Sequence, residues 1–529
     1  MDRRYVFLES KSGDKVPALI TQSGNTPLHS MVDPKREAQR LVSTITDDTG
    51  FLIILGLGGG FIPDAALANT AAQVIVMDFN ITELLSAIDY SKLTRNARFT
   101  LIADPSPQEI KCFIRDRYNP ALCGGIKVIP LRTRTDADRE KFSAAVCAIE
   151  EAIENAGADY SVQAHFGKRW FSNIVRNIKE IKAPQENIFF NEQPNEAAIA
   201  AAGPSLDLQI PALKECKSRR AFIICSDTAL PVLLHHDIEP DTVVSIDCQH
   251  ISYYHFMNCK MNDIPLFLDI ASPPLLGSFS QSPVFFTSDH PLAQYISEYW
   301  QPLPRLDTSG GNVTYACLSL AENIGAKNII LFGADFSYIR SRTYAKGTYI
   351  YPFFEKKQNR LSPLEALSSA FLYRSPFLPR EKTDPEQEYY ETSQLRFYRK
   401  KLEEKAAVME AFITFAQGKG APINIYNEKK TGKTPKRTEQ LMSGGVQNKI
   451  IDSEKFLEQY RDDIKALPDA DNEDYLQKLH IKDRKIFITL LPYTAFLKHR
   501  NPALKTKDLI EDAKRLSVQE IDRVLQTTC

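Results

Sequence analysis

The chain lacks the features that mark several common protein classes. It has 65 Lys and Arg against 66 Asp and Glu, a formal net charge of −1, whereas a dedicated nucleic-acid binder carries a strong basic excess. No apolar run approaches the roughly 20 residues that span a bilayer, and the first residues have no apolar signal-peptide segment. We therefore expect a cytoplasmic protein with no membrane span and no nucleic-acid partner.

The cysteines form no metal-binding or disulfide pattern. All nine are scattered, and no two of them have CxxC spacing. Reduced core cysteines are typical of such a chain, so we expect no zinc site and no other metal.

The length of 529 residues predicts several domains, because a single hydrophobic core stops growing at about 250–300 residues. Short apolar runs alternate with helical stretches, a pattern typical of doubly wound α/β domains. We predict an α/β protein with two Rossmann-like doubly wound domains and a C-terminal helical domain. The predicted parts are an N-terminal domain over 1–150, a helical connector over 151–194, a central domain over 195–435 and a helical domain over 436–529.

The individual elements follow from the same pattern. Apolar runs predict strands at 51–55, 74–77, 99–103, 126–130, 197–202, 221–225, 242–246, 265–268, 284–286 and 328–332. We also expect a helix over 396–417, a final strand over 423–426, and an insertion over 339–395 that covers the ligand crevice. The first 45 residues read as polar and turn-rich.

A glycine-rich turn follows the first predicted strand. It runs Gly56-Leu-Gly-Gly-Gly60, and Asp78 ends the next strand, 18 residues after Gly60. Nucleotide-binding folds place an acid there for the ribose hydroxyls. A tight turn in a scaffold domain without a ligand is the interpretation we favour, because the pattern is common.

Polar residues follow nearly every strand of the second ladder. Asp227, Asp247 with Gln249, and Asp335 all occupy such positions. In an open α/β sheet the carboxyl ends of the strands line the ligand crevice. These residues therefore predict a binding site at one edge of the central sheet.

Two turns in this domain are suited to a phosphate. In the first, Gly203 allows close backbone approach, Pro204 fixes the turn and Ser205 begins a helix. The second, Thr308-Ser309-Gly310-Gly311, precedes another helix. Together they predict a site for a nucleotide-activated sugar, although an ordinary capped turn would also account for each alone.

Two tyrosines follow the strand that ends at Asp335. Tyr338 and Tyr344 stand six positions apart, and a phenol can donate to a departing phosphate. Aromatic residues at such positions more often pack than react.

Three stretches together resemble one family. AAGPSLD (201–207), PDTVVSIDCQ (240–249) and the segment from Thr308 to Tyr338 are similar to the motility accessory factor family of flagellin glycosyltransferases. That family has a central domain like 6-hydroxymethylpterin pyrophosphokinase, and the same motifs are similar to bacterial sialyltransferases that use CMP-sialic acid. The resemblance covers about 195–430.

The resemblance implies a role for each motif. Gly203, Pro204 and Ser205 would hold the nucleotide, Asp227 and Asp247 would lie beside the base and ribose, and 309–311 would contact the cytidine or phosphate. It also implies transfer of a nonulosonic acid, such as pseudaminic or legionaminic acid, from a CMP donor to Ser or Thr of flagellin. No cofactor is required for such a transfer.

One departure concerns the general base. The sialyltransferases carry a catalytic His before the helix that matches 396–417, where this chain reads EYYET (388–392). Glu391, Asp335 or an acceptor-side residue would have to serve.

Three hypotheses therefore stand. The first is the CMP-dependent glycosyltransferase. The second is a pterin pyrophosphokinase-like phosphotransferase with Mg²⁺ held by Asp227, Asp247 and Asp335. The third is a non-catalytic flagellin-binding or assembly factor. Homo-oligomerisation stays open in all three.

Overall fold

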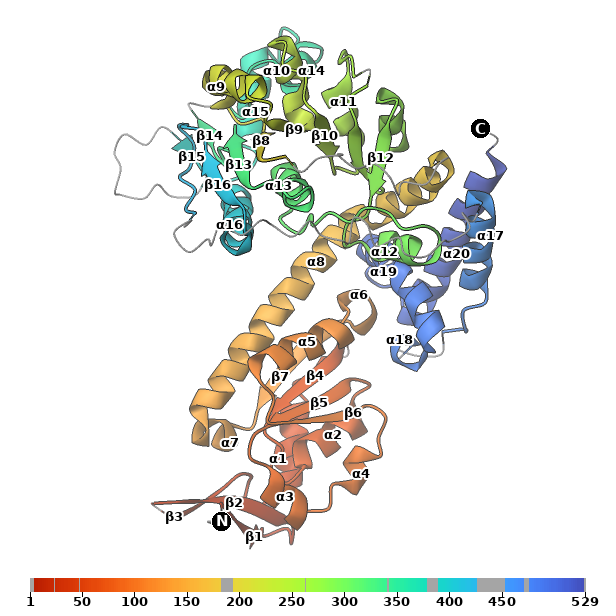
Figure 1. The fold of residues 1–529 in the computed structure, drawn as a ribbon. Helices are drawn as coiled ribbons and strands as arrows, with labels where there is room; N and C mark the ends of the chain where they lie inside the picture. The colour runs from red at the N-terminus through yellow and green to blue at the C-terminus, as the bar shows by residue number, and fades with distance from the viewer. Residues whose placement is uncertain are drawn as a thin grey trace. The chain divides into compact units, whose positions relative to one another are not determined.

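The computed structural model of the chain divides into two compact units (Figure 1). One unit contains residues 1–167 and 467–515, and the other contains residues 168–466 and 516–529. The structure describes residues 4–527 apart from 23, 47, 182–193, 262, 340–341, 378–388, 426–451 and 471–474.

The first unit is built on a four-stranded parallel sheet in the order β6-β5-β4-β7. Its strands are β4 (Thr49–Leu55), β5 (Gln73–Asp78), β6 (Phe99–Ala103) and β7 (Gly125–Pro130). The sequence predicted all four, because a strand covered on both faces reads as a continuous apolar run.

A small antiparallel sheet precedes it. It consists of β1 (Tyr5–Glu9), β2 (Lys15–Thr21) and β3 (Gly24–Pro27). The sequence analysis did not predict this sheet, because its short strands mix apolar and polar residues and lie between turns.

A single helix, α8, runs for 42 residues over Arg139–Glu180. The mixed charge and the lack of breakers over 138–182 predict a helix there, close to the observed range. The remainder of the predicted connector, 182–193, lies outside the described residues.

The second unit contains a seven-stranded parallel sheet in the order β12-β11-β10-β9-β8-β13-β16. Its strands are β8 (Glu196–Ala200), β9 (Phe222–Ser226), β10 (Thr242–Ser245), β11 (Leu266–Asp269), β12 (Pro283–Phe286), β13 (Asn328–Phe332) and β16 (Phe412–Phe415). The chain moves from β8 to β12 in one direction and then returns to place β13 on the other side of β8. Strand order therefore reverses between β8 and β13.

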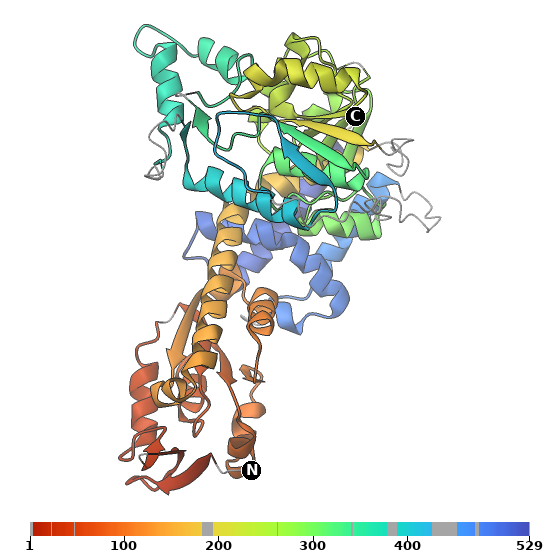
Figure 2. The ribbon, with the colours of Figure 1, turned by 60° about the vertical axis from the view of Figure 1, so that its left-hand side comes forward.

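Helices cover both faces of this sheet (Figure 2). On one face lie α13 (Val313–Asn323) and α16 (Ser393–Val408), while α9 (Leu206–Ser218) lies on the other. The core joins strand residues such as Ile199 and Ile329 to Cys317 of α13 and Leu402 of α16. All four side chains are fully buried.

The prediction of one helix over 396–417 is wrong. The helix α16 ends at Val408, and Phe412–Phe415 forms β16, which pairs in parallel with β13. Aromatic and β-branched residues favour the extended strand, and β13 offers an unpaired edge that satisfies its backbone groups. The predicted final strand is absent over the described residues 423–425, and Tyr426 lies outside them.

The predicted insertion contains short elements. It includes β14 (Tyr338–Ile339), α14 (Ile350–Glu355), α15 (Leu364–Leu372) and β15 (Tyr389–Tyr390). The strands β14 and β15 pair with each other, so the two ends of the insertion are joined.

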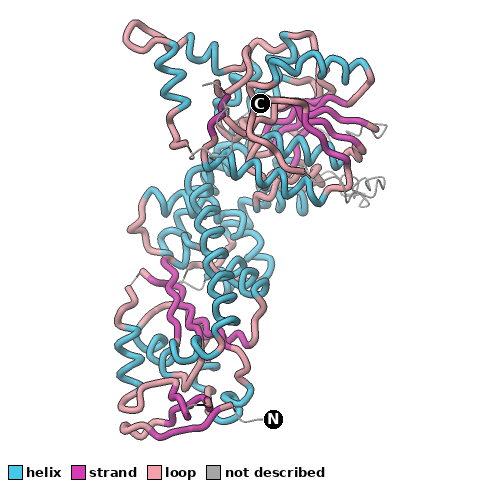
Figure 3. Tube along the Cα trace, turned by 90° about the vertical axis from the view of Figure 1, so that its left-hand side faces the viewer, coloured by secondary structure: helices cyan, strands magenta, loops and turns pink. Residues whose placement is uncertain are grey.

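The C-terminal region is helical, as predicted; its helices are labelled in Figure 1, and all helices are drawn in cyan in Figure 3. It contains α17 (Ser453–Lys465), α18 (Tyr475–Lys478), α19 (Ile481–Arg500) and α20 (Thr506–Gln526). Among the described residues, no helix is long and apolar enough to cross a membrane. The α/β class with parallel sheets is confirmed, whereas the assignment of both sheets to Rossmann-like domains and the domain boundaries stay predictions.

Candidate functional site

A cavity of about 400 Å³ opens where the strand order of the large sheet reverses. In open α/β sheets, ligands bind at this switch point, beyond the carboxyl ends of the strands. Residues that follow four strands line it: Ala201, Ala202 and Gly203 after β8, Ser226 and Thr228 after β9, Asp247 after β10, and 333–337 after β13. The start of α13 and the insertion supply further lining residues.

The Gly203 turn is held tightly against the end of β13. A Cβ atom at position 203 would stand 2.4 Å from both Asp335 Oδ2 and the Gly333 carbonyl oxygen. The Gly203 backbone N–H donates to that carbonyl at 2.9 Å. The close packing of the two turns therefore accounts for glycine at this position without a ligand.

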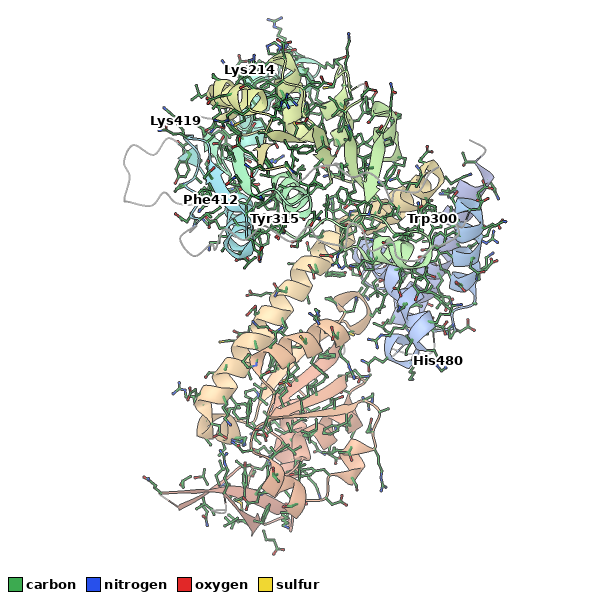
Figure 4. The ribbon with its side chains drawn as sticks, viewed as in Figure 1. Lys214, Trp300, Tyr315, Phe412, Lys419 and His480 are labelled. Carbon is green, nitrogen blue, oxygen red and sulfur yellow. The ribbon has the colours of Figure 1, made fainter. Side chains whose placement is uncertain are left out.

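Asp335 and Ser205 hold the same turn from within. The backbone N–H of Ser205 donates to Asp335 Oδ2 at 2.7 Å, and the Ser205 hydroxyl accepts from the backbone N–H of Lys419 at 3.0 Å. Lys419 is labelled in Figure 4. Burial raises the pKa of Asp335, and the bond from Ser205 opposes that shift. Asp335 lines the cavity, yet its carboxylate positions the turn.

Tyr338 and Tyr344 both line the cavity. Tyr338 is fixed by the pairing of β14 with β15, opposite Tyr390. Tyr344 is fixed by its neighbours, because Ala345 N–H donates to the Ala202 carbonyl at 2.9 Å. Burial raises the pKa of Tyr344 well above its ordinary value, and the nearby Tyr349 adds to the shift. The Tyr344 phenol therefore stays protonated and can donate a hydrogen bond.

Asp207 fastens the loop that carries Tyr344. Its Oδ2 pairs with Arg342 at 2.7 Å, and its Oδ1 accepts from the backbone N–H of Lys346 at 2.9 Å. One carboxylate in the first turn of α9 thus holds the loop on both sides of the tyrosine.

Asp227 lies behind the cavity wall. Its side chain is fully buried, accepts from Ser245 Oγ at 2.6 Å and pairs with His255 Nδ1 at 3.2 Å. Burial alone would raise the pKa of Asp227, but the neighbouring His255 and the hydrogen bonds hold it below its ordinary value. Its neighbours Ser226 and Thr228 reach the cavity instead.

Asp247 is an acidic side chain that lines the cavity directly. It accepts from the backbone N–H of Gln249 at 2.9 Å. Burial raises the pKa of Asp247, and the negative charge of Asp227 adds to the shift. A carboxylate with a raised pKa inside a cavity is suited to take up a proton.

In the turn 308–311, polar groups of Ser309 are already hydrogen-bonded to the neighbouring side chain of Asp307. Asp307 Oδ1 accepts from the Ser309 hydroxyl at 2.7 Å and from the Ser309 backbone N–H at 3.0 Å. Asp307 Oδ2 accepts at 2.8 Å from the hydroxyl of Tyr315, which is labelled in Figure 4. Gly311 has a φ of +71°, a conformation that favours glycine. The residues of this region that line the cavity are Asn312, Val313 and Thr314.

The cavity thus brings together part of the predicted site. Five predicted residues line it, namely Gly203, Asp247, Asp335, Tyr338 and Tyr344. The others lie in adjoining turns or behind the wall, outside the lining residues: Pro204, Ser205, Asp227, Gln249, Thr308, Ser309, Gly310 and Gly311.

Sequence reasoning missed several lining residues. They are Asn312, Thr343, Arg374, Ser375, Thr392, Gln394 and Tyr398. Asn312 could have been found, because it is the N-cap of α13 and accepts from Tyr315 N–H at 3.0 Å. The others come from the insertion and the start of α16, where no local pattern marks a residue as facing a site.

Two residues considered for metal binding or base chemistry already pair with other side chains. Glu391 holds Arg396 at 3.1 Å and Arg399 at 2.9 Å. Asp227 pairs with His255. Within the part of the chain that the structure describes, no group of three or more His, Cys, Asp or Glu side chains could hold a metal ion.

Side chains of the protein contact the glycine-rich turn of the first unit and the acidic residue beside it. Asp78 accepts from Leu57 N–H at 2.7 Å and pairs with the fully buried Arg134 at 2.9 Å. Gly59 N–H donates to His29 Nε2 at 2.8 Å. Burial lowers the pKa of His29 to about 4, which keeps it a neutral acceptor. These contacts fit the scaffold interpretation favoured for this turn.

Comparison with known proteins adds three findings. Residues 172–341 match the family model described as 6-hydroxymethylpterin diphosphokinase MptE-like. Uncharacterized proteins of Treponema pallidum (strain Nichols) are 36% identical over 126 residues and 22% identical over 237 residues. These matches cover 23% and 45% of this chain, and 45% and 52% of the relatives. The chain thus spans about half the length of the curated relatives it matches.

A solved structure matches nearly the whole chain. It is described as a MAf glycosyltransferase from Magnetospirillum magneticum AMB-1, with a TM-score of 0.56 and 14% identity. The match covers 99% of this chain and 91% of that one. The two chains share a fold. The MptE-like region includes β8 to β14, and so contains most of the residues that line the cavity.

Proposed function

We propose that the chain is a glycosyltransferase that moves a nonulosonic acid from a CMP donor to a hydroxyl group of a protein, with flagellin as the acceptor. The observation that carries the proposal is the cavity at the switch point of the large sheet, lined by Tyr338 and Tyr344. The fold shared with a MAf glycosyltransferase and the MptE-like match support it. The reaction needs no cofactor, and we place it in the cytoplasm.

The donor would lie across the switch point. Its nucleoside end would rest against the turn at Gly203 and its phosphate would face the start of α13, where Asn312 and Thr314 line the cavity. The positive end of the helix dipole favours a phosphate at that position. The phenols of Tyr338 and Tyr344 would donate to the phosphate oxygens.

Charge develops on the phosphate during the reaction. The bond between the anomeric carbon and the phosphate oxygen breaks, and its electron pair leaves with CMP. The acceptor oxygen forms the new bond to the anomeric carbon and loses its proton to a base. Donors already placed at the phosphate stabilise this transition state more than the ground state.

Asp247 is the base that the geometry supports best. It lines the cavity, whereas Glu391 is held by two arginines and Asp335 holds the Ser205 amide. Its raised pKa strengthens it as a proton acceptor relative to an ordinary aspartate. This assignment replaces the histidine that the sialyltransferases use and this chain lacks at the matching position.

The test is release of CMP from CMP-pseudaminate, CMP-legionaminate and CMP-N-acetylneuraminate, with and without purified flagellin. We expect flagellin-dependent release with one donor and a matching mass increase on flagellin. Tyr338→Phe and Tyr344→Phe should each lower kcat by about 10- to 100-fold. No flagellin-dependent release with any of the three donors would contradict the proposal.

A second candidate is a diphosphokinase, favoured by the MptE-like match over 172–341. It would need Mg²⁺ held by carboxylates, with Asp227, Asp247 and Asp335 as the candidates. These residues do not fit that role, because Asp227 is buried against His255 and Asp335 is bonded to Ser205. Mg²⁺-dependent turnover of ATP with a hydroxymethylpterin would favour this candidate over the first.

A further inference from the structure

Arg374 is a cation that lines the cavity from the insertion. It follows α15, and its guanidinium carbon lies 4.0 Å from the centre of the Phe371 ring. Stacking on an aromatic face restricts the guanidinium and leaves its N–H groups available at the edges. The side chain therefore presents several donors in a limited range of orientations.

The guanidinium lies close enough to three tyrosines in and beside the cavity for its charge to act on them. Burial raises the pKa of Tyr344, Tyr349 and Tyr398, and the positive charge of Arg374 opposes that shift at all three. These residues come from different segments of the insertion and from α16. The charge of Arg374 is thus felt on more than one side of the cavity.

Neighbouring cations are already paired with carboxylates. Arg342 pairs with Asp207, Arg396 and Arg399 pair with Glu391, and Lys405 pairs with Glu322. Arg374, by contrast, forms no ion pair with any carboxylate in the part of the chain that the structure describes. A positive side chain that faces a cavity without a counter-ion favours an anionic ligand.

We propose that Arg374 binds the phosphodiester of the nucleotide donor and, with Tyr344, stabilises the phosphate as CMP departs. The inference rests on the proposed function and adds a residue to it. A guanidinium can bind two phosphate oxygens at once through two parallel N–H groups, a planar geometry that a lysine ammonium does not offer. Negative charge on the phosphate grows as the glycosidic bond breaks, so the interaction strengthens toward the transition state.

The carboxylate of the nonulosonic acid offers the same chemistry to a guanidinium, so the experiment separates the two groups. Arg374→Met and Arg374→Lys are compared with Arg360→Met, an exposed arginine of the same insertion that does not line the cavity. Binding of cytidine, CMP and CMP-N-acetylneuraminate is measured by calorimetry on the full chain. Thermal melting checks that each variant is folded.

Arg374→Met should weaken CMP binding by at least about 10-fold and leave cytidine binding unchanged. Arg374→Lys should recover only part of the loss, and Arg360→Met should match the wild type. An unchanged affinity for CMP with a loss confined to CMP-N-acetylneuraminate would overturn the phosphate assignment in favour of the carboxylate. Unchanged affinity for both ligands would overturn the inference, while a wild-type chain that binds no CMP would overturn the proposed function itself.

Discussion

The carboxylates in this site have separate tasks, and the protein partners of each one decide which task it has. Asp335 and Asp227 are both bonded to protein partners, so they shape the site rather than react. Asp247 lines the cavity with a raised pKa. Sequence position alone treats the three as equivalent, because each follows a strand.

Asp247→Asn gives the residue-scale prediction. The ionised form of Asp247 is the base, and burial raises its pKa, so wild-type activity should fall as the pH drops through a value above the ordinary range of aspartate. The variant should lose activity by about 10²- to 10³-fold and lose this acid limb as well. Measurement of kcat against pH for both proteins tests it, and an unchanged acid limb in the variant would exclude Asp247 as the base.

The same variant should be more stable than the wild type. A protein with a carboxyl whose pKa is raised in the folded state loses stability as the pH rises from the unfolded pKa of that carboxyl through its folded pKa, and the full cost of burying the ionised form applies above the folded pKa. Asn removes this cost, so Tm should rise by about 1–3 °C at pH 7 and much less at pH 4. Melting at both pH values tests the sign, and an equal drop at both would indicate a merely structural aspartate.

At the scale of elements, the loop with Tyr344 depends on α9. Asp207 pairs with Arg342 and accepts from Lys346 N–H. Asp207→Asn should therefore lower kcat by about 10-fold through misplacement of Tyr344, with Tm changed by less than about 2 °C. Glu215→Gln is the matched control, since it removes an exposed ion pair with Arg219 on the same helix. Equal kcat values in the two variants would contradict the role of Asp207.

A second prediction rests on the close approach of the turns that follow β8 and β13. A methyl group at position 203 would meet Asp335 and Gly333 at 2.4 Å, so Gly203→Ala should lower the free energy of unfolding by about 1–3 kcal/mol and weaken CMP binding. Gly157→Ala in α8 meets nothing within 4 Å and should instead stabilise by about 0.5–1 kcal/mol. Urea denaturation measures both, and a neutral Gly203→Ala would contradict the packing argument.

Much of the central sheet could be predicted because buried parallel strands read as continuous apolar runs. The exception is Phe412–Phe415. No Gly or Pro marks the end of the preceding helix, and the segment becomes a strand because it pairs with β13. The site divides in the same way. Motifs at strand ends indicated Gly203, Asp247 and the tyrosines, whereas Arg374 reaches the cavity only through the folding of the insertion.

At the scale of the whole molecule, the two parallel sheets use their switch points differently. In the small sheet, Arg134 and His29 fill the space around the glycine-rich turn. In the large sheet, a cavity of about 400 Å³ lies at the corresponding position. We therefore expect the first unit to act as a scaffold and the second to bind the ligand.

Arg134→Met tests this division. The substitution leaves Asp78 buried without its ion-pair partner, so the free energy of unfolding should fall by about 3–5 kcal/mol. The double variant Asp78→Asn with Arg134→Met should recover part of the loss. CMP affinity, measured by calorimetry below the melting transition, should match the wild type in both variants. A loss of CMP affinity in the folded variants would place a nucleotide in the first unit.

The most direct test of the central claim is a crystal structure of the full chain soaked with CMP. We expect CMP in the switch-point cavity of the large sheet, with the cytidine against Gly203 and the phosphate within hydrogen-bond distance of Tyr338, Tyr344 and Arg374. CMP bound at the glycine-rich turn of the first unit, or a saturating soak that leaves the switch-point cavity without CMP, would contradict it.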